Sequence, residues 1–243
     1  MDEAQEQESQ LIHASLGKAI ELGEHSSNRL EDLVALNLLP ELPQSCYIPW
    51  TTSSIRPSSL QVVLNEIFIH QRKVIVECGA GISTIYIASI LEENDAVLYS
   101  IDHSEEWMEV VKSQMDKSGV SKERVTFIHA PLAPSDATPQ GKYWYDTGRL
   151  LMKCPVKGVD LLLVDGPIGG IDGMAHGRYP ALPFFKPRMA DNFAVFLDDC
   201  HREGEMWIAR KWIEEFELKG VYMPEKGDIC SFRQKGVKAF NII

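Results

Sequence analysis

A glycine bend, defined by Gly79 and Gly81, follows a short apolar run that begins at residue 73. An apolar segment of helical character, Ile85 to Leu91, comes directly after the bend. A side chain at either glycine would block the close approach of a ligand, and the N-terminus of the following helix offers free backbone N–H groups to an anionic group. The spacing therefore predicts a nucleotide-binding bend, although many phosphate- and dinucleotide-binding proteins carry a similar one.

Asp102 ends the second apolar run, about 20 residues after the glycines, where a carboxylate can accept hydrogen bonds from both hydroxyl groups of a ribose. Glu77, just before the first glycine, is less usual in NAD sites, and Thr84 stands where dinucleotide-binding proteins often have a third glycine. This combination favours a ligand that contains a ribose and disfavours NAD. In the alternative, the glycines only make the turn and Asp102 only caps the helix that follows it.

Three more carboxylates follow apolar runs later in the chain: Asp165 ends one run, and Asp198 with Asp199 ends the next. In a parallel α/β sheet the carboxyl ends of the strands share one edge, so we expect these side chains to converge. They would repel one another unless a positive group lay between them, and an oxygen-binding ion such as Mg²⁺ or Ca²⁺ meets that need. In the alternative, Asp198 or Asp199 pairs with Arg202 or Arg178, and Asp165 bonds backbone groups.

A histidine could act as the general base if no metal is bound, because an imidazole titrates near neutral pH. His201 and His176 are the candidates, and either could instead be a capping or surface residue. The aromatic residues at 142–146 and the glycine-rich stretch at 169–180 are expected to shape a pocket for a second substrate, although the aromatic residues could also simply cover the sheet. The loop at residues 50–56 could close over the site or tie the N-terminal helices down.

The elements that position these residues alternate between strand and helix from residue 73 onward. Short β-branched runs separated by helix-sized segments predict a parallel sheet with helices on both faces. We expect an N-terminal helical extension and loop over residues 1–70 and one main domain over residues 71–243. The predicted strands are Lys73–Val76, Val97–Ile101, Val125–Ile128, Leu161–Val164 and Phe193–Leu197, followed by an antiparallel last strand at Ile229–Arg233.

Apolar residues with helical spacing form three segments before the glycine bend, around residues 11–20, 30–34 and 58–68. Ser58 and Gln61 fit a capping box at the start of the third segment. The residues expected to face inward from that helix are Leu60, Val63, Leu64, Ile67 and Phe68.

Two later helices have sequence signals for their ends. One is expected to start at Ser104 and to stop at Gly119, and the other is expected to end near Gly220. The residues expected to face inward are Trp107, Val110 and Val111 in the first, and Ile208, Ala209, Trp212, Ile213 and Phe216 in the second.

With these motifs in this order, residues 73–233 resemble the class I S-adenosylmethionine-dependent methyltransferases. The resemblance rests on the motif from Glu77 to Gly81, on Asp102, and on the ends of the third and fourth strands at residues 128–131 and 164–167. It implies a Rossmann-like three-layer sandwich, in which a mostly parallel seven-stranded sheet has an antiparallel last strand and N-terminal helices are added. It also implies contacts to S-adenosylmethionine from Glu77, Gly79, Gly81, Ser83, Thr84, Asp102, His103 and Ala130.

Asp165, Asp198 and Asp199 are similar to the ligands of metal-dependent O-methyltransferases, which have an Asp at the end of strand four and an Asp-Asn pair at the end of strand five. Asp199 departs from that pattern, since it stands in place of the Asn. The resemblance implies methylation of a small molecule at a hydroxyl group, with Asp165 at the catalytic site and Mg²⁺ or Ca²⁺ as the metal. His201 is the second predicted catalytic residue, as the base if no metal is bound. Two other functions stay open: an NAD-dependent oxidoreductase and a non-catalytic S-adenosylmethionine-binding protein.

Composition narrows the range of partners. The formal net charge of -11, without a cluster of Lys and Arg, argues against nucleic acid. No apolar run approaches the roughly 18 to 20 residues of a membrane span, and the acidic start is unlike a signal peptide, so we expect a cytoplasmic protein that does not enter membranes. The five cysteines are scattered without C-x-x-C spacing, which predicts neither disulfides nor a zinc site. The N-terminal helices could supply the surface of a homodimer.

Overall fold

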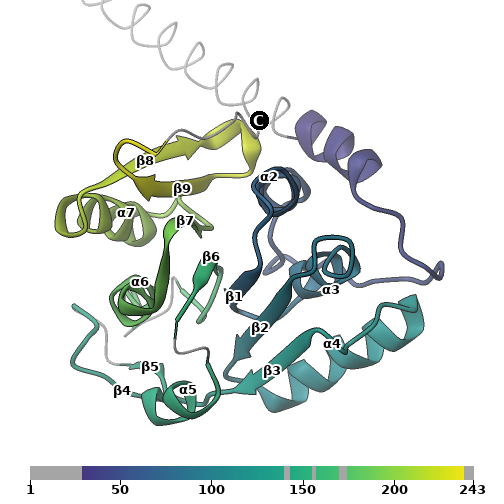
Figure 1. The fold of residues 1–243 in the computed structure, drawn as a ribbon, viewed down its shortest axis with the longest axis horizontal. Helices are drawn as coiled ribbons and strands as arrows, with labels where there is room; N and C mark the ends of the chain where they lie inside the picture. Colours follow the sequence, from purple (N-terminus) through teal and green to yellow (C-terminus); the bar gives the residue numbers. More distant parts are fainter. Residues whose placement is uncertain (1–28, 140–142, 155–156, 170–173, 238–243) are drawn as a thin grey trace, which may run out of the picture.

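A seven-stranded sheet runs through the centre of the molecule, with helices on both faces (Figure 1). This computed structural model describes residues 29–139, 143–154, 157–169 and 174–237. The strand order in the sheet is β3-β2-β1-β6-β7-β9-β8, and β4 and β5 form a separate two-stranded ribbon. The strands are β1 (Val74–Cys78), β2 (Val97–Asp102), β3 (Val125–His129), β4 (Leu132–Pro134), β5 (Tyr143–Tyr145), β6 (Val159–Val164), β7 (Met189–Leu197), β8 (Leu218–Met223) and β9 (Ile229–Gln234).

Five neighbouring strands of the large sheet are parallel, from β3 across β2, β1 and β6 to β7. Strand β9 is antiparallel to both β7 and β8, which confirms the prediction for the last strand. Strand β8 is not among the predicted strands. The preceding helix ends at Glu215 rather than near Gly220, and Gly220 lies within β8. A Cβ on Gly220 would stand 2.5 Å from Cδ1 of Ile213, so the glycine lets the helix pack closely on this strand.

Alternate residues of the central strands contribute to two apolar cores, one on each face of the sheet. Val76 and Leu162 pack in the core that includes residues of α5, α6 and α7, whereas Ile75 and Leu161 pack in the core that includes residues of α2, α3 and α4. Burial on both faces explains why the strands are continuous apolar runs, and it confirms the three-layer α/β sandwich. The helices are α2 (Pro57–Ile69), α3 (Ile82–Ser89), α4 (Glu105–Ser118), α5 (Thr147–Lys153), α6 (Ala181–Phe185) and α7 (Glu203–Glu215).

Helix α2 begins at Pro57 and takes its N-terminal cap from another part of the chain. Oδ1 of Asp32, in a helical stretch at residues 29–38, accepts hydrogen bonds from the backbone nitrogen of Ser58 at 3.2 Å and from its hydroxyl at 2.6 Å. The predicted capping box of Ser58 is therefore wrong, because its hydroxyl donates to Asp32 and no side chain caps the helix from within. Periodicity located the helix, whereas its cap depends on a tertiary contact.

Helix α4 has the predicted ends. The hydroxyl of Ser104 accepts a hydrogen bond from the backbone nitrogen of Trp107 at 3.1 Å, and Gly119 ends the helix with a φ of 71°. Both are local signals, a side-chain cap and a glycine in the left-handed region. Local chemistry was therefore sufficient to locate these ends.

Three apolar residues predicted to face inward lie at the borders of the buried helix faces instead. Phe68 is 53% exposed, Val110 is 42% exposed and Ile213 is 37% exposed. Apolar spacing locates the middle of a buried face better than its borders, because the width of that face depends on what packs against it. The helix expected at residues 11–20 lies outside the described residues. None of the described helices is long and apolar enough to cross a lipid bilayer.

Candidate cofactor and acceptor site

A cavity of about 310 Å³ opens at the carboxyl ends of β1, β2, β6 and β7. It lies where the strand order changes direction, since β1 has β2 on one side and β6 on the other. Ligands of open α/β sheets bind at this switch point. Of the predicted cofactor residues, five line the cavity, namely Gly79, Gly81, Ser83, Asp102 and His103. The loop after Trp50 contributes Thr51, Ser54 and Ile55 to the same wall.

The two glycines of the bend have different structural roles. Gly79 has a φ of 98°, and a Cβ there would stand 2.9 Å from the backbone nitrogen of Gly166. Glycine is therefore required at position 79 for two reasons: its backbone has a positive φ, and the backbone of Gly166, just after β6, leaves no room for a side chain. A Cβ on Gly81 would meet no atom within 4 Å, and Gly81 lines the cavity. Gly81 is the glycine that leaves room for a ligand.

Asp102 holds the walls of the cavity together. Its Oδ2 accepts a hydrogen bond from the backbone nitrogen of Ala80 at 3.0 Å, and its Oδ1 accepts one from the backbone nitrogen of Ser104 at 2.8 Å. A carboxylate has about four acceptor positions, so further acceptor capacity remains for a ligand. His103 lies beside it, with Nδ1 of its ring 3.3 Å from Oδ1 of Asp102, and this contact with the carboxylate raises the pKa of His103.

Three predicted cofactor residues, Glu77, Thr84 and Ala130, do not line the cavity but lie behind it. Oε2 of Glu77 accepts hydrogen bonds from the hydroxyl groups of Thr84 at 2.6 Å and Ser100 at 2.7 Å, whereas its buried Oε1 has no hydrogen-bond partner within the part of the chain that the structure describes. The hydroxyl of Thr84 also accepts a hydrogen bond from the backbone nitrogen of Gly81 at 2.9 Å. Burial raises the pKa of Glu77 to about 7. Glu77 and Thr84 therefore support the bend from inside the protein.

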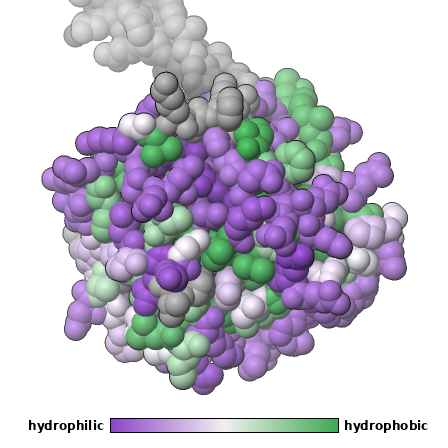
Figure 2. Space-filling model, in the orientation of Figure 1, coloured by the Kyte–Doolittle hydropathy of each residue, from purple (hydrophilic) through white to green (hydrophobic). Residues whose placement is uncertain are grey.

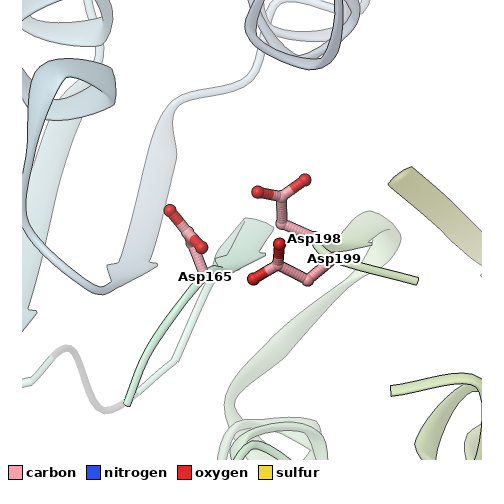
Figure 3. A group of neighbouring side chains, drawn as sticks. All are labelled: Asp165, Asp198 and Asp199. Atoms are coloured by element: carbon pink, nitrogen blue, oxygen red, sulfur yellow. The ribbon is translucent and has the colours of Figure 1, made fainter. Parts of the chain in front are cut away.

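The three predicted aspartates do converge. Asp165 follows β6, and Asp198 and Asp199 follow β7 (Figure 3). One carboxylate oxygen from each lies within 4.8 Å of the others, and Asp165 and Asp199 line the cavity. Burial, followed by the neighbouring charge of Asp198, raises the pKa of Asp165 well above its ordinary value. Burial, followed by the charge of Asp199, raises the pKa of Asp198 to about 7.

The positive group between these carboxylates is an arginine of the chain. Nη2 of Arg178 lies 3.3 Å from Oδ1 of Asp165 and 3.0 Å from Oδ2 of Asp199. Nη1 of Arg202 lies 2.8 Å from the same Oδ2 of Asp199. Oδ1 of Asp165 and Oδ2 of Asp199 already face the guanidinium, and an ion held by the other carboxylate oxygens would lie beside this fixed positive charge. The residues in this arrangement therefore do not fit such an ion, even though Oδ1 of Asp198 is buried with no hydrogen-bond partner among the described residues. The aspartate at position 199, where the metal-dependent enzymes have Asn, is explained by its two arginine partners.

Neither candidate histidine reaches the cavity. The side chain of His201 is 54% exposed, and its Nδ1 lies 3.9 Å from Oδ2 of Asp228. His176 stacks on Trp207 with ring centroids 4.2 Å apart, and its Nδ1 lies 2.8 Å from the carbonyl oxygen of Pro139. These positions disfavour both histidines as the base and leave Asp165 as the predicted catalytic residue at the cavity wall.

Two aromatic residues that were not among the predicted cofactor or catalytic residues line the cavity. Tyr145 is 1% exposed, and its hydroxyl has no hydrogen-bond partner among the described residues. Nε1 of Trp107 donates to the carbonyl oxygen of Ala80 at 2.7 Å and so fixes the bend. The aromatic stretch at 142–146 was the signal for Tyr145, whereas its neighbour Trp144 is buried in the core and covers the sheet.

The other segments predicted to shape the pocket, the loop at residues 50–56 and the glycine-rich stretch at 169–180, supply only some of the residues that line the cavity. Arg56 bonds Asp32 at 2.7 Å, so this end of the loop ties down the helix at 29–38, while Thr51 lines the cavity. Gly169 of the glycine-rich stretch also lines it, and residues 140–142 and 170–173 lie outside the described residues.

Comparisons with known proteins agree with this fold. A family model described as a methyltransferase domain matches residues 76–200. A search of curated proteins found no match. A solved structure of a candidate O-methyltransferase from Klebsiella pneumoniae is similar, with 17% identity over 77% of this chain and 83% of that chain and a TM-score of 0.52. A candidate caffeoyl-CoA O-methyltransferase from Staphylococcus aureus has 14% identity over 89% of this chain and 98% of that chain, with a TM-score of 0.54.

At these identities the solved structures show the fold. The family model goes further, because its match spans just over half of the chain and includes the glycine bend, Asp102, Asp165 and both aspartates after β7. The chain therefore belongs to the methyltransferase-domain family and is a class I S-adenosylmethionine-dependent methyltransferase.

Proposed function

We propose that this enzyme transfers a methyl group from S-adenosylmethionine to a hydroxyl oxygen of a small molecule. The observation that carries the proposal is one cavity in which Gly81, Asp102 and Asp165 share the wall. Its volume of about 310 Å³ lies in the range of small-ligand sites. The similar proteins from Klebsiella pneumoniae and Staphylococcus aureus are both candidate O-methyltransferases, which supports oxygen as the acceptor atom.

In this proposal the cofactor lies across the carboxyl ends of β1 and β2. The bend at Gly79, Gly81 and Ser83 contacts the methionine part, Asp102 accepts from the ribose hydroxyl groups, and His103 borders the adenine. Glu77, Thr84 and Ala130 stabilise this wall from behind. Asp102 suits its role because it is almost fully buried while its carboxylate has acceptor capacity left.

The acceptor lies beside Asp165 and Tyr145 in this proposal. The acceptor oxygen attacks the methyl carbon, the carbon–sulfur bond breaks, and its electron pair stays on sulfur. Asp165 accepts the hydroxyl proton as general base. The hydroxyl of Tyr145, for which the described residues supply no hydrogen-bond partner, offers one to the acceptor. Because little other acid–base chemistry is needed, most of the acceleration comes from holding oxygen and methyl carbon about 3 to 3.5 Å apart.

Titration calorimetry with S-adenosylmethionine, S-adenosylhomocysteine and NAD tests the cofactor site. We expect the first two to bind, and we expect Asp102→Asn to weaken them at least about tenfold, since it removes a charged acceptor. Asp116→Asn is the matched control, because Asp116 lies on the exposed side of α4. Binding of NAD without binding of S-adenosylmethionine would contradict the proposal.

Release of S-adenosylhomocysteine with a panel of phenols, catechols, hydroxy acids, amines and RNA tests the acceptor class. We expect turnover with a hydroxyl compound and a product methyl signal typical of an ether or ester in NMR spectra. Asp165→Asn should abolish turnover while cofactor binding persists. Methylation of amines or RNA alone would contradict the acceptor class, and undiminished turnover by Asp165→Asn would contradict its role. Cofactor binding without turnover of any hydroxyl compound in the panel would favour a non-catalytic binding protein.

We further propose that residues 71–243 form the catalytic unit and that the helix at 29–38 supports a homodimer. That helix has a largely apolar surface (Figure 2), with Leu30 63% exposed, Leu33 57% exposed and Val34 55% exposed. Contiguous exposed apolar residues of this kind are typical of protein contacts.

A further inference from the structure

The guanidinium of Arg178 is fixed inside the carboxylate cluster. Its side chain is 4% exposed. Its Nε donates to the carbonyl oxygen of Pro167 at 3.2 Å, and its Nη1 donates to the carbonyl oxygen of Asp198 at 3.1 Å. Its Nη2 lies between the carboxylates of Asp165 and Asp199, at 3.3 and 3.0 Å. All three nitrogens therefore have acceptors, which determine where the group sits.

The backbone around Arg178 is also fixed. The backbone nitrogen of Tyr179 donates to the carbonyl oxygen of His176 at 3.0 Å, and that of Ala181 donates to the carbonyl oxygen of Arg178 at 3.2 Å. The indole nitrogen of Trp212, in α7, donates to the carbonyl oxygen of Tyr179 at 3.0 Å. A turn held in this way keeps the arginine in the cluster.

A divalent cation and this guanidinium would compete for the same place. Mg²⁺ and Ca²⁺ take carboxylate oxygens at about 2.0 to 2.6 Å. Oδ1 of Asp165 accepts a hydrogen bond from Nη2 of Arg178, and Oδ2 of Asp199 is ion-paired with the same nitrogen. An ion held by the remaining carboxylate oxygens, among them the buried Oδ1 of Asp198, would lie beside this fixed positive charge. Arginine keeps its charge at every accessible pH, so it cannot become neutral to admit an ion. The buried position strengthens the repulsion between two cations. A second arginine, Arg202, bonds the same oxygen of Asp199 and adds to this repulsion.

We propose that Arg178 is the built-in cation of this three-aspartate cluster, and that the cluster binds no divalent metal ion. Arg178 acts as a positioning residue, because it orients Asp165 and Asp199 at the cavity wall without itself taking part in bond making. The inference goes beyond the proposed function and does not depend on which acceptor is methylated.

Binding of Mn²⁺, followed by electron paramagnetic resonance on the full chain, tests this proposal. We expect the wild-type protein to show no binding with a Kd below about 1 mM, and its Tm to stay unchanged in 10 mM Mg²⁺ or Ca²⁺ (~10 times that Kd). We expect Arg178→Gln, which removes the charge, to bind Mn²⁺ at least about tenfold more tightly than the wild type, and Arg178→Lys, which keeps it, to resemble the wild type.

Two outcomes would overturn the proposal. One is binding of Mn²⁺ to the wild type that Asp165→Asn abolishes. The other is a folded Arg178→Gln protein whose affinity for Mn²⁺ equals that of Arg178→Lys. If Arg178→Gln does not fold, the comparison of the wild type with Asp165→Asn decides. Calorimetry with S-adenosylhomocysteine is run on each variant, so a failure of the cofactor site is recognised separately from a failure of this inference.

Discussion

At the scale of single residues, the site is dominated by carboxyl groups that the fold has removed from water. Glu77 is fully buried behind the glycine bend, and burial raises its pKa from 4.5 to about 7. Asp198 shows the same effect at the other side of the cavity, with a pKa raised to about 7 by burial and by Asp199. Such groups are costly to ionise in the folded state, so they connect the protonation of the site with the stability of the protein.

Glu77 gives the first prediction. Because its pKa is higher in the folded state than in the unfolded state, the stability it contributes is fully present below pH 4.5 and is lost as the pH rises through about 7. Relative to Glu77→Gln, the wild-type free energy of unfolding should therefore fall between pH 5 and pH 8, by about 3 kcal/mol at most. Urea unfolding of both proteins at the two pH values measures this. Glu93→Gln, at an exposed position, is the control, and a difference that does not vary with pH would contradict the prediction.

At the scale of elements, most residues of the site lie in the short loops that follow the strands, and the strands and helices position these loops. The bend between β1 and α3 is held by three hydrogen bonds: its backbone nitrogens donate to the side chains of Asp102 and Thr84, and the indole of Trp107 donates to one of its carbonyl oxygens. The bend is thus rigid before a ligand arrives, which reduces the conformational cost of binding. The roles of its two glycines can be distinguished experimentally, because only Gly79 has a backbone conformation that requires glycine.

Gly81→Ala and Gly79→Ala form a matched pair. Gly81 has an extended backbone, with a φ of -179°, and open space at its Cβ, so alanine there should leave the free energy of unfolding unchanged or raise it by up to about 1 kcal/mol. The added methyl group lies in the cavity and should weaken S-adenosylhomocysteine binding at least about tenfold. Gly79→Ala meets a positive φ and a backbone contact at 2.9 Å, and should destabilise the protein by about 2 kcal/mol. Calorimetry and urea unfolding measure both effects; unimpaired binding by Gly81→Ala would refute the assignment of the bend.

Helix α2 gives a third prediction, because its cap comes from Asp32. Asp32→Ala removes the acceptor of the Ser58 N–H and hydroxyl groups and the partner of Arg56. We expect the free energy of unfolding to fall by about 1 to 2 kcal/mol, most of it from the lost cap, since the ion pair is partly exposed. Asp116→Ala, at a surface ion pair on α4, should cost less than about 0.5 kcal/mol in the same urea titration. Equal effects of the two substitutions would show that Asp32 does not cap the helix.

At the scale of the whole molecule, the net charge and the exposed apolar residues indicate which partners the protein can bind. The net charge of -11 repels polyphosphate chains, which is consistent with a small acceptor. The helix at 29–38 is fastened to the main domain by Asp32 and by the ion pair of Glu31 with Lys226 at 2.6 Å. Leu30, Leu33 and Val34 nevertheless face outward, and the surface they form supports the proposed homodimer.

The dimer can be tested with one surface substitution. Leu33→Glu places a charge in the middle of the exposed apolar face and should convert a dimer into a monomer in analytical ultracentrifugation, with no change in the circular dichroism spectrum. Leu151→Glu, exposed to 58% on α5, is the control and should leave the dimer intact. A wild-type protein that sediments as a monomer at every concentration would rule the dimer out.

The sequence alone determined the parts of this protein that follow from local periodicity and from the geometry common to parallel sheets. Apolar runs and helical spacing gave the three layers, and the shared edge of the strand ends brought Asp102, Asp165 and Asp199 to one cavity. Neither result needs information about which side chains touch. Glycines in a strand-to-helix bend were likewise readable, because the backbone conformation there is a local property.

Only the tertiary structure decided what neutralises the aspartates and which residues reach the cavity. Arg178 enters the cluster, His201 stays outside it, and Asp32 caps a helix that begins far from it in the sequence. Each of these positions depends on the path of a loop, and the periodic pattern of apolar residues does not predict the path of a loop. Side chains distant in sequence compete for the same buried place, and the packing of the complete chain determines which of them occupies it.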